Sequence, residues 1–78
     1  MEKQEILAQV ECIFRDILDD ETIVLMDSST ANDIEDWDSL THIQLIVAIE
    51  KHFHIKFTSR EILSWNNVGE MIDCIAGK

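Results

Sequence analysis

One short segment of the sequence, Asp38-Ser39-Leu40, combines residue types that suit phosphate chemistry. The apolar spacing after it predicts a helix that begins at Asp38 or Ser39, and the first N–H groups of a helix have no internal partners. A serine there can bear a phosphodiester, which the positive end of the helix dipole favours by about 0.3–1 kcal/mol. The aspartate beside it can help bind the Mg²⁺ that delivers a phosphoryl group. The same residues also form a good helix N-cap, which is the more common role of such a tripeptide.

Helices are expected on both sides of this segment. Apolar residues recur at helical spacing from Glu2 to Leu18 and again from the serine to about His52. Thr58-Ser-Arg-Glu61 is a capping box that predicts a short helix, and Asn67 caps a last helix. In that last helix four apolar residues are expected to face inward: Val68, Met71, Ile72 and Ile75. The predicted fold is all-α, a small four-helix bundle of three longer helices and one short helix with a long first loop.

The first loop, residues 19–38, is unusually long for so small a domain, and loops of this kind tend to be functional. Ile23, Leu25 and Ile34 are expected to pack over the end of the bundle. The residues from Thr30 to Asp33 are expected to start one helical turn. Residues 54–57 alternate like a strand, but a lone short strand has no partner, so they are interpreted as an extended connector.

The second helix is apolar on more than one side. Leu45, Ile49 and Phe53 fall on one arc at 100° per residue, whereas Leu40 and Val47 lie nearly opposite. Two interpretations follow, and the pattern does not separate them. Either the helix is central and buried nearly all round, or it presents an exposed apolar strip to a partner.

Taken as a whole, residues 37–57 (WDSLTHIQLIVAIEKHFHIKF) resemble the phosphopantetheine-attachment segment of acyl carrier proteins. That family shows Asp-Ser-Leu, then apolar positions, then an acidic residue before a phenylalanine, which match Glu50 and Phe53 here. The resemblance implies that Ser39 receives a covalent 4′-phosphopantetheine arm from coenzyme A and that Asp38 assists the transfer. It also implies that partners dock on the second helix, at Leu40, Gln44 and Val47.

The resemblance implies a carrier, not an enzyme, with no catalytic residues of its own. Such a protein carries an acyl or aminoacyl group as a thioester and presents it to partner enzymes. The partners implied are a phosphopantetheinyl transferase, an acyl- or aminoacyl-loading enzyme, and a downstream transferase or synthase. The alternative from another class is an unmodified acidic module that binds basic partners.

Several positions depart from the family pattern. Fatty-acid carriers usually have glycine three residues before the serine, where this chain has Asp36, and they carry a row of acids along the second helix. The matching positions here are Thr41, Gln44 and Lys51. These departures predict a carrier dedicated to a specialised pathway. Trp37, next to the motif, is interpreted as a lid packed on the bundle, the alternative being a contact with partners.

Charge favours protein partners over nucleic acid. The chain has 16 acidic and 6 basic residues and a net charge of −10, which repels nucleic-acid phosphates and anionic lipid headgroups. Residues 1–38 hold 12 acids and 2 bases (12 − 2, net −10), while residues 39–78 hold 4 of each (net 0). A partner's basic patch is therefore predicted to meet Asp33, Glu35 and Asp36, beside the serine, unless these acids serve only solubility.

The remaining signals define the class of protein. With 78 residues the chain is predicted to form one domain, residues 1–78, and a monomer. No apolar stretch is long enough to span a bilayer and no signal sequence is found, so a cytoplasmic protein without membrane insertion is expected. Cys12 and Cys74 are expected to be free thiols, with Cys12 exposed. His42, His52 and His54 do not share a helical face, so no metal site is predicted.

Overall fold

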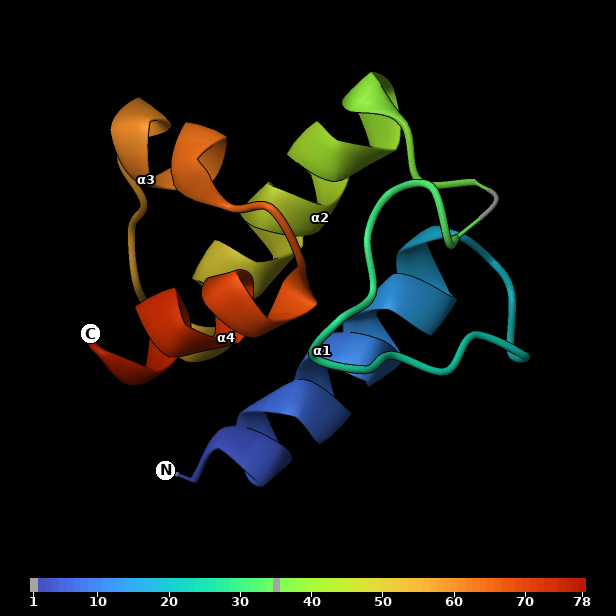
Figure 1. Ribbon diagram of the computed structural model, residues 1–78, viewed down its shortest axis with the longest axis horizontal. Helices are drawn as coiled ribbons and strands as arrows, with labels where there is room; N and C mark the ends of the chain where they lie inside the picture. Colours follow the sequence, from blue (N-terminus) through green and yellow to red (C-terminus); the bar gives the residue numbers. More distant parts are fainter. Residues whose placement is uncertain (1, 35) are drawn as a thin grey trace.

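The computed structural model describes residues 2–34 and 36–78, which fold into helices joined by loops (Figure 1). The helices are α1 (Lys3–Ile17), α2 (Ser39–Phe53), α3 (Ser59–Ser64) and α4 (Val68–Ala76). No β-strand is found within these described ranges. The predicted fold of three longer helices, one short helix and a long first loop is confirmed, and the predicted helix ends are correct to within about one residue.

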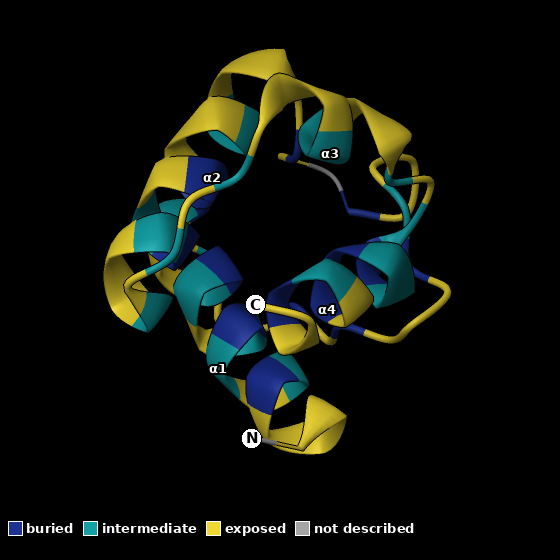
Figure 2. Cartoon of the chain, turned by 90° about the vertical axis from the view of Figure 1, so that its left-hand side faces the viewer, coloured by how far each residue is buried: buried dark blue, intermediate teal, exposed yellow. Residues whose placement is uncertain are grey.

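The core lies where α1 packs against α2 and α4. Phe14 of α1, Leu45 and Ile49 of α2, and Val68 of α4 are fully buried. Figure 2 shows the buried faces of α1 and α4 turned toward the inside of the molecule. The inward faces predicted for α1 and α4 from apolar spacing are therefore confirmed.

The outer side of α2 is not buried. Leu40 is 68 % exposed, Ile43 63 % and Val47 44 %, and much of this side of the helix is marked as exposed in Figure 2. Of the two interpretations that the sequence left open, the structure excludes a helix buried nearly all round. Ile43 lies on the exposed side together with Leu40 and Val47.

The long first loop is held against the bundle by both side chains and backbone. Ile23, Leu25 and Ile34 are buried, as predicted. The Nε of Arg15 donates a hydrogen bond to the carbonyl of Ile23 at 2.8 Å, which joins the loop to α1. The middle of the loop is joined to α4 by backbone hydrogen bonds.

The backbone of Gly69 comes close to the loop at the start of α4. Its N–H donates to the carbonyl of Asp27 at 2.8 Å, and the N–H of Val68 donates to the carbonyl of Ser29 at the same distance. A Cβ at position 69 would lie 2.9 Å from that Asp27 oxygen, closer than real Cβ atoms come. Glycine is therefore needed at this position for the loop to reach α4.

Side-chain caps begin the two C-terminal helices. Thr58 accepts from the N–H of Glu61, whose carboxylate accepts from the N–H of Thr58, so the predicted capping box of α3 is confirmed. The side chain of Asn67 accepts from the N–H of Glu70 and caps α4, as predicted. Residues 55–58 before α3 form neither helix nor strand. His54, which was predicted to belong to the extended connector, instead ends α2 in the left-handed conformation, at φ 58°.

Candidate functional site

Asp38 is the N-cap of α2, and Ser39 is the first residue of the helix. One carboxylate oxygen of Asp38 accepts from the N–H groups of Leu40 and Thr41, both at 3.0 Å, and the Thr41 hydroxyl accepts from the N–H of Asp38. The bond from the Thr41 N–H is the main reason that the pKa of Asp38 lies below its ordinary value. Asp38 is therefore ionised at neutral pH. Of the three residues Asp38-Ser39-Leu40, the aspartate is the one that caps the helix.

Ser39 is left free for chemistry. Its side chain is exposed, and in the described ranges its hydroxyl makes no hydrogen bond. Ser29, in contrast, is buried and its hydroxyl accepts from the N–H of Met26. Ser59 is also exposed at the start of a helix, so a terminal position alone does not distinguish Ser39. What distinguishes Ser39 is the aspartate before it and the cavity beside it.

A cavity of about 530 Å³ opens next to Ser39. The end of the first loop and the start of α2 form one side, through Trp37, Ser39 and His42. The other side comes from α3, the α3–α4 connection and α4, through Ile62, Trp65, Asn66, Asn67 and Met71. We call this cavity the serine groove. The sequence did not predict its second side, although an aromatic residue next to two asparagines in a short connection was a weak signal.

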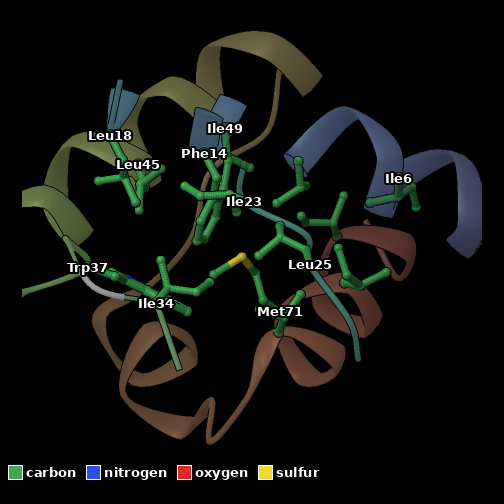
Figure 3. Close-up of a cluster of buried hydrophobic side chains, with 14 residues drawn as sticks. Ile6, Phe14, Leu18, Ile23, Leu25, Ile34, Trp37, Leu45, Ile49 and Met71 are labelled. Atoms are coloured by element: carbon green, nitrogen blue, oxygen red, sulfur yellow. The ribbon is translucent and has the colours of Figure 1, made fainter. Parts of the chain in front are cut away.

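Trp37 forms the inner side of the serine groove and is held by three contacts. Its Nε1–H donates to Nδ1 of His42 at 3.0 Å, and the two rings stack with centroids 5.8 Å apart. The indole also meets Phe14 edge to face, at 4.9 Å between centroids. Figure 3 shows Trp37 in the same buried cluster as Phe14 and Met71. The interpretation of Trp37 as a lid packed on the bundle is confirmed, since only 9 % of it is exposed.

His42 is half-buried and lines the serine groove. Burial lowers its pKa below the ordinary value, so the ring is neutral at pH 7. Because Nδ1 accepts the Trp37 hydrogen bond, the ring proton lies on Nε2. The groove therefore has a hydrogen-bond donor three residues after Ser39.

The family model described as "Phosphopantetheine attachment site" matches residues 5–75 of the chain. The chain belongs to this family. The solution NMR structure of a holo acyl carrier protein from Geobacter metallireducens is 44 % identical and superposes with a TM-score of 0.87, over 92 % of this chain and 83 % of that one. The search of curated proteins found no match. The protein is thus a carrier that bears covalent 4′-phosphopantetheine, and its family members are not enzymes.

The outer face of α2 in this carrier is apolar and nearly free of acids. Leu40, Ile43 and Val47 follow one another at spacings of three and four, and they form one exposed stripe with Gln44 beside it. We call these four residues the α2 strip. The one acidic residue of α2, Glu50, uses its carboxylate to accept from the N–H of Phe57 at 2.8 Å. Glu50 is therefore committed to an internal bond.

Acidic residues lie instead before the helix. Asp33 and Asp36 are both exposed, and Glu35 lies outside the described residues. A carboxylate oxygen of Asp33 accepts from the N–H of Thr30 at 3.0 Å, so Asp33 also holds the turn at residues 30–33. The N–H of Asp33 also donates to the carbonyl of Thr30 at 3.0 Å, so these residues form a single hydrogen-bonded turn that does not continue into a helix.

Metal-binding groups, cysteines and membrane-spanning helices were also considered in the described part of the chain. Among the described residues there is no group of three or more His, Cys, Asp or Glu that could hold a metal ion. Cys12 and Cys74 are free, and Cys12 is exposed as predicted. In residues 2–34 and 36–78, no helix has the length and apolar character needed to cross a membrane.

Proposed function

We propose that Ser39 bears the arm and that the protein presents an acyl or aminoacyl thioester to its partner enzymes. The observation that carries this proposal is an exposed serine hydroxyl that follows an ionised aspartate and borders the serine groove. Within residues 2–34 and 36–78 this hydroxyl makes no hydrogen bond. The helix start suits the phosphodiester, because its free N–H groups and dipole favour negative charge.

Attachment is a phosphoryl transfer from coenzyme A. The Ser39 oxygen attacks the phosphorus next to the pantetheine moiety, a new P–O bond forms, and the pyrophosphate bond breaks. Adenosine 3′,5′-bisphosphate leaves, and the hydroxyl proton passes to a base of the phosphopantetheinyl transferase. Asp38 helps to bind the Mg²⁺ of that enzyme, since hard cations prefer carboxylate oxygens. A carrier needs no further chemistry, because a tethered thioester has a high effective concentration at each partner.

Docking is assigned to two neighbouring surfaces. The α2 strip supplies apolar contact through Leu40 and Val47 and a polar amide through Gln44. The acids Asp33, Glu35 and Asp36 attract a basic patch on the partner. Partners are a phosphopantetheinyl transferase, a loading enzyme, and a downstream transferase or synthase. Because α2 lacks the usual row of acids, we assign the carrier to a specialised pathway. We also propose that the protein is a monomer of one domain, residues 1–78, and that it acts in the cytoplasm. Its two cysteines are free, as is usual in a reducing compartment.

Intact-mass measurement after incubation with coenzyme A and a broad-specificity transferase tests the proposal. Wild-type protein should gain one phosphopantetheine, and Ser39→Ala should gain none. Ser59→Ala is the matched control, since Ser59 has the same exposed position at the start of α3, and it should be labelled normally. The free energy of unfolding of Ser39→Ala should stay within about 0.5 kcal/mol of wild type, because the cap is Asp38. Labelling of Ser39→Ala would refute the assignment of the arm to Ser39, whereas a wild type that takes no arm would leave the unmodified acidic module as the better description.

A further inference from the structure

The serine groove is lined by Trp37, a large side chain that is only 9 % exposed, and this feature indicates a class of cargo. We infer that the groove holds the thioester end of the arm and that Trp37 is its inner wall, so that this carrier favours short or compact acyl groups over long alkyl chains. The inference rests on the proposed attachment at Ser39.

The wall is fixed in place. Trp37 lines the groove on one side and contacts Phe14 on the other, at 4.9 Å between ring centroids. The hydrogen bond to His42 prevents free rotation of the indole. A cargo that enters beside Ser39 therefore meets a held aromatic ring before it reaches the core.

Behind the wall the core is filled. Phe14, Leu45 and Ile49 are fully buried, and Figure 3 shows them gathered with Trp37 in one cluster. A second apolar cavity, of about 200 Å³, is lined by Ile6, Phe53, Ile55, Ile75, Ala76 and Lys78, and shares no residue with the serine groove. An extended alkyl chain has no continuous path from one cavity to the other, because interiors packed at this density do not open without cost.

The lining suits a compact cargo with a carbonyl group. Trp65 and Met71 offer apolar contact opposite Trp37. His42 offers its Nε2–H. The side-chain oxygen of Asn67 caps α4, and among the described residues its NH₂ group has no hydrogen-bond partner. A thioester carbonyl can accept from such donors, whereas the added methylenes of a longer chain would remain in water.

The test compares two acyl lengths on the intact carrier. Wild type, Trp37→Leu, Trp37→Phe and Phe53→Leu are loaded with butyryl or decanoyl arms from the matching coenzyme A thioesters, and intact mass confirms one arm on Ser39. Cleavage of each thioester by hydroxylamine is then timed, because a sheltered carbonyl reacts slowly. Phe53→Leu is the matched control: it also loses an aromatic ring, but at the distant cavity.

In wild type, both thioesters should be cleaved at least threefold more slowly than free butyryl-pantetheine, and their rates should agree within twofold. In Trp37→Leu, the decanoyl thioester should become at least threefold slower than the butyryl one, because the wall is shortened. Trp37→Phe and Phe53→Leu should keep the wild-type pattern, since the first retains a ring at the wall and the second leaves the wall intact.

Three results would overturn the inference while leaving attachment at Ser39 intact. The first is a wild-type butyryl thioester that is cleaved as fast as free butyryl-pantetheine. The second is a wild-type decanoyl thioester that is already cleaved more than threefold more slowly than the butyryl one. The third is a difference between the two acyl lengths in Phe53→Leu that equals the difference in Trp37→Leu. Failure of wild type to take any arm at Ser39 is a different outcome, visible in the mass measurement before hydroxylamine is added. That result would refute the proposed function, and the inference would fall with it.

Discussion

Truncating one buried and one exposed residue of α2 separates its structural role from its docking role. Leu45 is fully buried, and Leu→Ala at such a site costs about 2–5 kcal/mol. Val47 is 44 % exposed, so removal of its two methyl groups costs less than about 1 kcal/mol, given about 0.8 kcal/mol for each fully buried methylene. Alanine also has the better helix propensity, by a few tenths of a kcal/mol, so the net loss in Val47→Ala is expected to be near zero.

The assay for stability is urea unfolding at 25 °C, and the assay for docking is the KM of a phosphopantetheinyl transferase for the apo carrier. A domain of this size has a free energy of unfolding of roughly 4–12 kcal/mol, so Leu45→Ala should lower the urea midpoint strongly. Val47→Ala should leave it nearly unchanged but raise the KM about fivefold, as loss of about 1 kcal/mol of interface contact does. Leu40→Ala, with 68 % exposure, should behave as Val47→Ala does.

Two outcomes would refute this reasoning. Equal destabilisation by Val47→Ala and Leu45→Ala would show that Val47 belongs to the core and that the α2 strip is not a separate surface. An unchanged KM in both Leu40→Ala and Val47→Ala, with the stability preserved, would show that the exposed strip does not dock this partner.

Three further predictions concern the approach to the serine. Asp38→Asn should keep the fold, because Asn caps as well as Asp, yet slow arm transfer roughly tenfold in a mass time course; an unchanged rate would remove the carboxylate from the mechanism. For His42, burial sets the pKa in the folded state below the unfolded value of about 6.5, so the unfolded chain binds more protons and stability falls as pH drops below that value. The urea midpoint of wild type should therefore fall more than that of His42→Gln between pH 7.5 and 5.5, and parallel curves would contradict this role. Asp36→Lys should slow association with the transferase and flatten the salt dependence of the association rate. Glu5→Lys, which reverses an exposed charge on α1, should change the association rate much less. Equal changes of rate in the two variants would show that the acids before α2 have no special part in docking.

The parts of the fold that sequence patterns predicted are those governed by local rules. Apolar spacing located α1 and α4, because a helix must bury one stripe, and Thr58, Glu61 and Asn67 marked helix starts through bonds that span only three residues. Residues 54–57 alternated like a strand, and the lack of a pairing partner correctly predicted that they form no strand, although His54 caps α2 rather than extending the connector.

Contacts between distant segments were not predictable in the same way. Whether Val47 is buried depends on how many elements surround α2, and the helical pattern is the same in both cases. The bond from Gly69 to the carbonyl of Asp27 joins residues 42 positions apart, and neither residue type signals it alone. The second side of the serine groove, from Trp65 to Asn67, was missed for the same reason.

The site combines a rigid base with a mobile group. The Asp38 capping box fixes the first turn of α2, and the Trp37 contacts with His42 and Phe14 hold the residue just before that cap. Ser39 therefore sits on backbone that is fixed on both sides, while its own hydroxyl is unbonded within the described chain. If Ser39 bears the arm as proposed, a partner that binds the α2 strip would meet the attachment point in one orientation, at little entropic cost to order it. The conformational freedom that delivery requires then belongs to the arm alone, where it sets the effective concentration of the thioester at each active site.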